Sequence, residues 1–128
     1  SAEEEFVIRR AREQDMTLYF EWANDPDVRR NAFSQEPIAW ESHQQWFLKK
    51  LTSETSHLFV LEQNGEPVGQ IRFDETEPRC FEIDFSIAPN MRGYGLGTKI
   101  LQYGIAELEV ATRSSSFCVY GKVKQENV

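Results

Sequence analysis

Apolar and polar side chains alternate strictly in the stretch FEIDFSI, which spans residues 81–87. Successive side chains of a β-strand point to opposite faces, so this period of two predicts a half-buried strand within 79–88. One face of that strand carries Glu82, Asp84 and Ser86, and the other face is entirely apolar. The pattern therefore places two carboxylates next to each other on the polar face of one strand.

Shorter apolar runs predict four more strands, at residues 6–8, 57–63, 67–74 and 117–123. Asn64 and Gly65 both tolerate positive φ, and such a pair between two strands predicts a tight hairpin. A second turn is expected at residues 75–78, just before the alternating strand. The central strands are therefore expected to pair antiparallel.

Apolar residues recur at helical spacing in three stretches, 14–23, 40–51 and 96–111, which predict helices. The first helix is expected to end before Pro26, because the residue that precedes a proline avoids helical backbone angles. Residues 27–33 are expected to form a helical turn or a loop. The resulting order, β-α-α-β-β-β-α-β, predicts an α+β fold with a mixed, mainly antiparallel sheet flanked by helices.

The length of 128 residues predicts a single domain spanning 1–128. No apolar run approaches the roughly 20 residues that a membrane-spanning helix needs. The acidic start at residues 3–5 is unlike a basic secretion signal, so a cytoplasmic protein with no membrane partner is expected. The formal net charge of -7 disfavours a nucleic-acid partner, which requires a basic surface.

The only two cysteines, Cys80 and Cys118, each lie inside an apolar strand pattern. In a cytosolic protein such residues are expected to be reduced and buried. His43 and His57 are expected to be ordinary residues, one on a helix surface and one at the start of a strand. Two cysteines and two histidines this far apart form no metal-site signature, so no metal is expected.

A glycine-rich loop, Arg92-Gly93-Tyr94-Gly95-Leu96-Gly97-Thr98, separates the alternating strand from the last predicted helix. Glycines at alternate positions let backbone amides approach a ligand closely, and a helix N-terminus favours anions. Arg92 adds a positive charge suited to phosphate oxygens. The spacing fits neither the dinucleotide fingerprint nor the P-loop. The loop is therefore expected to hold a pyrophosphate, and the alternative is a turn without a ligand.

The sequence of strand, loop, helix and strand resembles the GNAT acetyltransferases, in which an R/Q-x-x-G-x-G/A loop binds the pyrophosphate of coenzyme A. The resemblance implies acetyl-CoA as co-substrate. In that family the strand at 80–87 splays from the strand at 117–123, and the cofactor enters the gap between them. The positions that match cofactor-binding residues are Phe85, Ile87, Arg92, Gly93, Tyr94, Gly95, Leu96, Gly97, Thr98 and Asn127.

GNAT chains continue after a V-x-x-x-N segment with a helix and a last strand, and Val123 to Asn127 matches only the start of that region. The domain is therefore expected to be incomplete at its C-terminal end. The alternatives are a trimmed chain, a truncated gene product, and a chain completed by a second copy through dimerisation or strand exchange. The tyrosine that protonates the thiol in many family members lies on the missing helix, so no general acid is assigned.

Acetyl transfer to an amine requires a base, because an ammonium group is not nucleophilic. Glu82 matches the position of the base in the histone-type members of the superfamily, which share an E-I-x-F pattern on this strand. Asp84 is the second catalytic candidate. The structural alternative is that both carboxylates simply form the solvated face of the strand.

The pattern W-x-N-D-P-x-V-R-x-x-x-F from Trp22 to Phe33, with H-x-x-W-F at residues 43–47, resembles acetyltransferases of nucleotide-linked amino sugars. Arg29, Phe33 and Trp46 are accordingly the candidate residues for binding the acceptor. The resemblance implies an N-acetyltransferase that moves acetyl from acetyl-CoA to a small-molecule primary amine by direct attack. Because ribosomal-protein N-terminal acetyltransferases carry related patterns, a protein N-terminus is an alternative acceptor. A CoA-binding or dimerising module without catalysis is a further alternative.

Overall fold

The computed structural model describes residues 5–32 and 34–121. Its elements are β1 (Phe6–Arg10), η1 (Glu13–Asp15), α1 (Met16–Ala23), α2 (Pro26–Asn31), α3 (Trp40–Thr52), β2 (Ser56–Gln63), β3 (Glu66–Glu77), β4 (Cys80–Ile87), η2 (Pro89–Met91), α4 (Leu96–Thr112) and β5 (Cys118–Tyr120). The strands form one sheet in the order β1-β2-β3-β4-β5. Neighbouring strands are antiparallel except for the parallel pair β4 and β5, which confirms the predicted α+β class.

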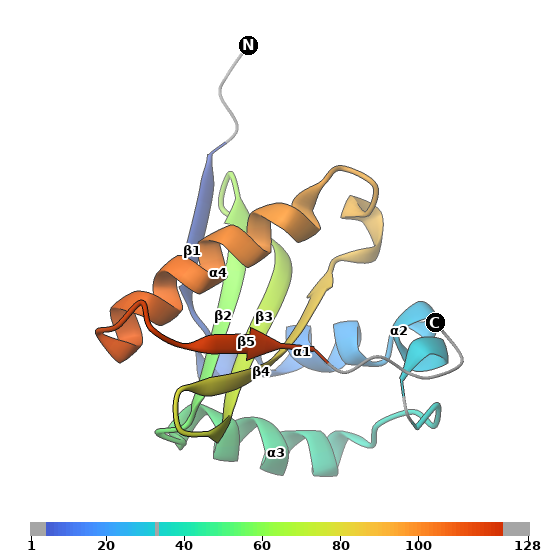
Figure 1. The fold of residues 1–128 in the computed structure, drawn as a ribbon. Helices are drawn as coiled ribbons and strands as arrows, with labels where there is room; N and C mark the ends of the chain where they lie inside the picture. The colour runs from blue at the N-terminus through green and yellow to red at the C-terminus, as the bar shows by residue number, and fades with distance from the viewer. Residues whose placement is uncertain (1–4, 33, 122–128) are drawn as a thin grey trace.

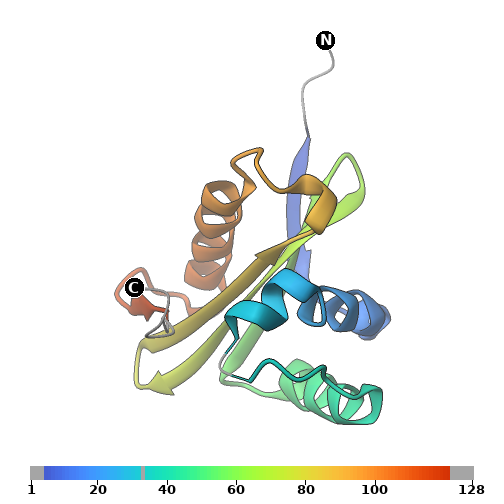
Figure 2. The ribbon, with the colours of Figure 1, turned by 90° about the vertical axis from the view of Figure 1, so that its right-hand side faces the viewer.

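Helices cover both faces of the sheet. The long helix α4 crosses one face, and α1, α2 and α3 lie on the other (Figures 1 and 2). Because side chains alternate along a strand, Ile71 and Phe73 of β3 face α4, whereas Gln70 and Arg72 lie on the side of α1 and α3. The polar residues Gln70 and Arg72 therefore face the shorter helices, on the side of the sheet opposite α4.

Each face of the sheet has its own apolar core. On the α4 side, fully buried residues of β2 and β3 pack against fully buried residues of α4. The strand residues are Phe59, Leu61, Ile71 and Phe73, and the helix residues are Ile100 and Leu108. Gly104 lets the helix approach closely, since a Cβ there would lie 2.9 Å from Cδ1 of Ile71. On the other side, a smaller core joins α1 and α3 to β2 through Met16, Tyr19, Phe47, Leu58 and Val60. The smaller core fixes the helices that stand over the polar face.

The segment expected to be a helical turn or a loop forms the short helix α2. Asp25 caps it, because its carboxylate accepts from the amides of Asp27 and Val28. Pro26 occupies the first helical position, where its missing N–H costs nothing. None of the helices within 5–32 and 34–121 combines the length and apolar character that a membrane span requires.

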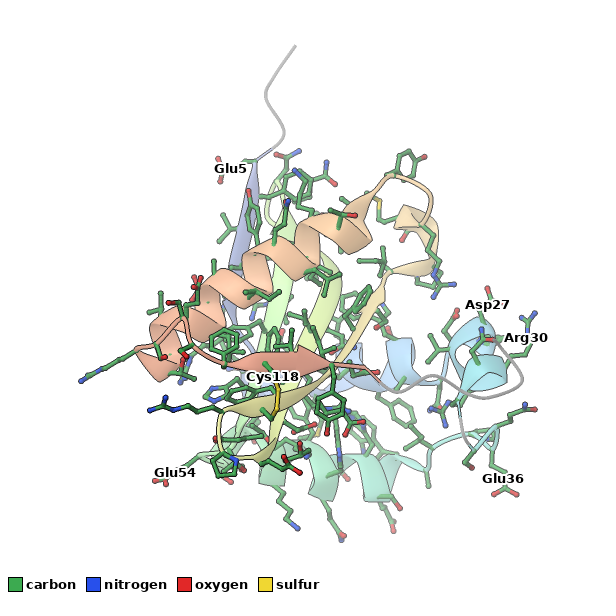
Figure 3. All side chains as sticks on the ribbon, in the orientation of Figure 1. Glu5, Asp27, Arg30, Glu36, Glu54 and Cys118 are labelled. Carbon is green, nitrogen blue, oxygen red and sulfur yellow. A yellow bond between two sulfur atoms is a disulfide. The ribbon has the colours of Figure 1, made fainter. Side chains whose placement is uncertain are left out.

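The expectation of reduced, buried cysteines is wrong. Cys80 and Cys118 form a disulfide between β4 and β5, drawn as a yellow bond in Figure 3. Cys80 is half-buried and Cys118 is exposed. The two residues face each other in the parallel register, which brings their Cα atoms to 4.7 Å. Sequence spacing did not reveal this contact, because the cysteines are 38 positions apart and the whole of α4 lies between them.

The last strand is shorter than predicted, because β5 pairs with only three residues of β4, Cys80, Phe81 and Glu82. From Ile83 onward, β4 has no partner other than β3 among the described residues. Asn127, the predicted cofactor contact near the C-terminus, lies outside the described residues. Within 5–32 and 34–121, the edge of β4 that no strand covers therefore begins at Ile83, next to Asp84.

Candidate active site

The glycine loop turns sharply from η2 into α4. Gly93 and Gly95 have φ values of 87° and 75°, a left-handed conformation that other residues adopt only with strain. Gly95 is the residue before the helix, and it offers no side chain to cap the first turn. The first amides of an α-helix have no partner within the helix, and they favour an anion at its N-terminus. This geometry suits the expected pyrophosphate cradle.

The residues of the glycine loop differ in how far they are exposed. Leu96 is buried in the core, so only its backbone faces the loop, whereas Tyr94 is highly exposed. A Cβ at Gly97 would lie 3.5 Å from the ring of Phe85, so the helix start packs against β4. Thr98, in the first turn of α4, is exposed. The loop therefore presents mainly backbone to a ligand.

Arg92 does not point freely into solvent. Its guanidinium lies 3.0 Å from a carboxylate oxygen of Asp25 and 3.2 Å from one of Asp27. Burial acts to raise the pKa of Asp25, but the hydrogen bond from Arg92 and the amides of α2 hold it below its usual range. The predicted phosphate-binding arginine is therefore ion-paired to the helix α2.

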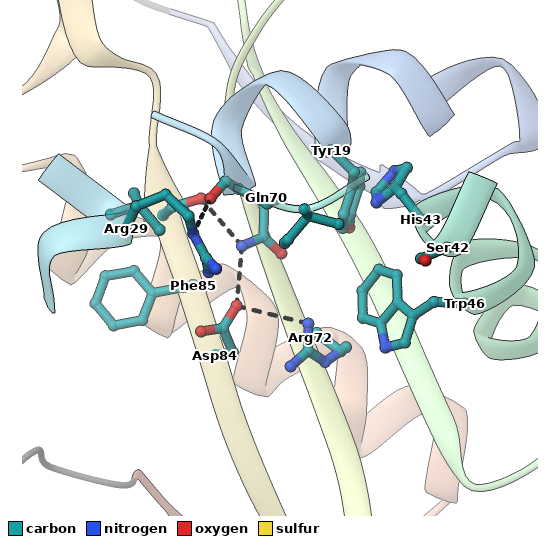
Figure 4. A pocket seen from close by; sticks show the side chains of 13 residues that line it. Tyr19, Arg29, Ser42, His43, Trp46, Gln70, Arg72, Asp84 and Phe85 are labelled. Carbon is teal, nitrogen blue, oxygen red and sulfur yellow. Dashed lines mark hydrogen bonds and ion pairs between the residues drawn. The ribbon is translucent and has the colours of Figure 1, made fainter. Parts of the chain in front are cut away.

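A cavity of about 460 Å³ opens between the polar face of the sheet and the helices α1, α2 and α3 (Figure 4). It is lined by Tyr19, Ala23, Val28, Arg29, Ile38, Ser42, His43, Trp46, Gln70, Arg72, Asp84, Phe85 and Ser86. We call it the helix-side cavity. It holds Arg29 and Trp46, which were predicted to bind the acceptor, together with the catalytic candidate Asp84.

A second cavity, of about 570 Å³, adjoins the first. We call it the loop-side cavity, because its lining reaches Ile87 and Arg92. The two cavities share Val28, Arg29, Asp84, Phe85 and Ser86. They therefore meet over residues 84–86 of β4, at the edge that β5 leaves uncovered.

The two candidate carboxylates stand in different places. Asp84 belongs to the lining of both cavities, and its side chain is 56% exposed. Its carboxylate accepts a hydrogen bond of 3.2 Å from Nε2 of Gln70 and lies 3.6 Å from Arg72. Glu82 lies opposite Asp74 on one side and Tyr120 on the other, nearer the disulfide, and is not among the described residues that line the two cavities. Of the two, only Asp84 lies where the cavities meet.

The candidates for binding the acceptor also differ. Arg29 lines both cavities, but its guanidinium donates to the backbone carbonyls of Ala23, Ser34 and Glu36 and so ties α2 to the following loop. Trp46 lies under Arg72, whose guanidinium carbon is 4.9 Å from the ring centroid. Phe33 lies outside the described residues.

Sequence reasoning missed several residues of this site. His43 is not on the helix surface as expected: it is 2% exposed, and Nε2 lies 2.8 Å from the carbonyl of Met16. Burial lowers the pKa of His43, although the bond to Met16 opposes that change. Gln70 and Arg72 were also missed. They alternate with Ile71 and Phe73 along β3, so the argument that identified the polar face of β4 would have found them.

Among the described residues, no group of three or more histidine, cysteine, aspartate or glutamate side chains is arranged to hold a metal ion. Asp84 and Ser86, which line both cavities, supply a carboxylate and a hydroxyl. The amide of Gln70 and the guanidinium of Arg72, from the lining of the helix-side cavity, lie next to them. Such a set can accept a proton from an amine and orient the amine by hydrogen bonds.

Comparison with solved structures shows the same fold in known acetyltransferases. An N-acetyltransferase from Staphylococcus aureus Mu50 is 22% identical, with a TM-score of 0.74 over 96% of this chain and 76% of that one. The aminoglycoside acetyltransferase AAC(6')-Ib in complex with coenzyme A is 21% identical, with a TM-score of 0.73 over 97% and 78%. Spermidine N-acetyltransferase from Vibrio cholerae in complex with CoA and spermine is 19% identical, with a TM-score of 0.76 over 95% and 73%.

No curated protein matches the chain. Residues 5–127, in contrast, match the family described as acetyltransferase (GNAT) domain. The match includes the glycine loop, the polar face of β4 and the helices over it. The chain therefore belongs to the GNAT acetyltransferase family and is an acetyl-CoA-dependent N-acetyltransferase.

Proposed function

We propose that the acetyl group passes from acetyl-CoA to a small-molecule amine at the junction of the two cavities. The observation that carries this proposal is the shared lining at residues 84–86. The loop-side cavity leads from this junction to Arg92 and the phosphate loop, so the thioester arm would enter there. The helix-side cavity leaves space for the amine on the opposite side. This arrangement supports direct attack in a ternary complex.

We propose Asp84 as the base, because its carboxylate lies at the junction. The amine nitrogen bonds to the thioester carbonyl carbon as the carbon–sulfur bond breaks. Asp84 takes the proton that the amine loses, and the thiolate of coenzyme A takes a proton from water. The backbone edge of β4 at Phe85 and Ile87, not covered by β5 among the described residues, is available to bind the thioester arm.

The charged residues of the helix-side cavity indicate which kind of amine can serve as the acetyl acceptor. Its lining has one acidic residue, Asp84, and two arginines, Arg29 and Arg72. A polycation such as spermine, which is bound in the Vibrio cholerae neighbour, would meet two arginines and a single carboxylate in this described lining. An acceptor with one amine and an anionic group fits better, and the face of Trp46 suits a sugar ring. We therefore propose a nucleotide-linked amino sugar as the acceptor.

The test is release of free coenzyme A thiol with a panel of acceptors at equal concentration. The panel contains a UDP-linked 4-amino-4-deoxyhexose, an aminoglycoside, spermidine and a peptide with a free N-terminus. We expect turnover with the UDP-linked amino sugar to exceed that with spermidine by at least about tenfold, which corresponds to 1.4 kcal/mol in the transition state. Preference for the peptide would support the alternative acceptor. Acetyl-CoA binding without any thiol release would support a non-catalytic module.

A further inference from the structure

Gln70 has a buried oxygen that no donor satisfies. The residue is 6% exposed, and its Oε1 has no hydrogen-bond partner within the described part of the chain. Its Nε2, in contrast, donates to Asp84 at 3.2 Å and to Ser86 at 3.0 Å. A buried acceptor without a donor costs about 1–3 kcal/mol, so such an atom in a cavity wall calls for a functional explanation.

The orientation of this amide follows from its neighbours. A carboxylate such as that of Asp84 only accepts hydrogen bonds, so the group that faces it has to be the NH₂ of Gln70. The oxygen is therefore turned away from Asp84, toward the side of Tyr19 and Trp46 (Figure 4). Gln70 lines the helix-side cavity, next to the residue proposed to take the proton.

We infer that Gln70 recognises a hydrogen-bond donor on the substrate that receives the acetyl group, next to the reacting amine. The amine lies at Asp84, and a hydroxyl or N–H on a neighbouring carbon donates to Oε1 of Gln70. The substrate class is thus an amino alcohol, or an amine with an equivalent adjacent donor. Gln70 is a specificity-determining residue in this scheme, since it holds the acceptor and takes no part in bond making.

The inference rests on the proposed function and deepens it. A site with a buried hydrogen-bond acceptor rejects a substrate analogue that lacks the matching hydrogen-bond donor. In the complex with that analogue, the acceptor atom of the protein is left unpaired. A simple primary amine can lose its proton to Asp84 but leaves Oε1 unsatisfied. The inference therefore explains how a cavity with few charged groups can still discriminate among amines.

The experiment compares a UDP-linked 4-amino-4-deoxyhexose with its 3-deoxy analogue, which lacks only the hydroxyl next to the amine. We expect kcat/KM of the wild-type protein to be about 10- to 100-fold higher for the hydroxylated compound. Gln70→Leu removes the acceptor oxygen, so the ratio between the two compounds is expected to fall to about one. Gln70→Met, which keeps the length of the side chain, replaces the leucine variant if that variant does not fold.

Ser86→Ala is the matched control, because it removes a contact of Nε2 and leaves Oε1 in place. Because Ser86 lines both cavities, kcat/KM is expected to fall equally for both compounds, so the ratio between them stays near the wild-type value. Turnover of both compounds at equal rates would overturn the inference and leave the proposed function intact. A preference for the hydroxylated compound that persists in Gln70→Leu would also overturn it, since a water molecule or another side chain would then bind the hydroxyl. Acetyl-CoA binding with no turnover of either compound would overturn both proposals.

Discussion

Arg92 donates a hydrogen bond of 3.0 Å to the carboxylate of Asp25, which joins the glycine loop to the helix α2. The same carboxylate oxygen accepts from the amides of Asp27 and Val28 and so caps that helix. Val28 and Arg29 in turn line both cavities. Arg92, the arginine expected at the pyrophosphate, is thus ion-paired to the helix that lines the helix-side cavity. An anionic cofactor that binds Arg92 therefore has to compete with the carboxylates of Asp25 and Asp27.

Asp27 allows this competition to be measured, because its carboxylate pairs with Arg92 without capping α2. It lies beside Arg30, with which it also forms an ion pair, at the exposed end of the helix (Figure 3). We expect Asp27→Asn to tighten binding of coenzyme A by about two- to fivefold, since exposed pairs contribute about 0.2–1 kcal/mol. Isothermal titration calorimetry at low salt gives the affinity.

Glu54→Gln is the control for net charge, because this exposed residue lies at the far end of α3 from the loop (Figure 3). It changes the overall charge by the same amount as Asp27→Asn and is expected to leave the affinity unchanged. Weaker binding in Asp27→Asn would mean that Asp27 supports Arg92 in the complex and does not compete with the cofactor.

Asp84→Asn tests the base. We expect it to lower kcat/KM by about 100-fold, a typical contribution of general base catalysis, with the largest loss at low pH, where neutral amine is scarcest. Glu82→Gln is the matched variant on the same face of β4 and is expected to have a smaller effect. A larger loss in Glu82→Gln, with its maximum at low pH, would transfer the role of base to Glu82.

The disulfide predicts a difference in stability between oxidised and reduced protein. A cross-link across 38 residues restricts the unfolded chain, which corresponds to about 4 kcal/mol in the chain-entropy description. Reduction, or the pair Cys80→Ser and Cys118→Ser, is therefore expected to lower Tm by roughly 10–20 °C. Thermal unfolding with and without reductant measures the difference. Two free thiols in the native protein, with a Tm insensitive to reductant, would contradict the cross-link.

The buried histidines predict a loss of stability in mild acid. Burial lowers the pKa of His43 and of His57, so folding favours their neutral forms. The unfolded chain then binds more protons than the folded one, and stability falls as the pH drops below about 6.5, the ordinary histidine value. We expect Tm to decrease from pH 7.5 to pH 5.5, and to decrease less in His43→Gln. An equal decrease in both proteins would contradict this prediction, because His43 would then bind protons equally in the folded and the unfolded chain.

Much of the fold was predictable because local signals agreed. Alternation identified β4, Asn64 and Gly65 identified the hairpin between β2 and β3, and the glycines identified the start of α4. The turn into α4 was predictable for the same reason, since its positive φ values fall on the glycines of the loop itself. These features depend on residues close together in the chain.

What the sequence did not predict depends on distant contacts. The bond between Cys80 and Cys118 needs the parallel register of two strands separated by a helix. The pairing of Arg92 with Asp25 joins positions 67 residues apart. His43 is buried because α1 packs on α3, which its own helix does not reveal. Local patterns fix the elements, whereas tertiary packing decides which polar groups meet.

The most direct test of the account is the affinity of Gly95→Glu for acetyl-CoA, compared with wild type and with Gly65→Glu. Gly95 and Gly65 have similar positive φ values, 75° and 84°, and an added Cβ has no atom within 4 Å at either site, so the two variants carry similar backbone strain. Only Gly95→Glu places bulk and negative charge in the phosphate loop. We predict that calorimetry detects acetyl-CoA binding in wild type and Gly65→Glu and none in Gly95→Glu. Equal affinity in all three proteins would contradict the assignment of the loop as the pyrophosphate site.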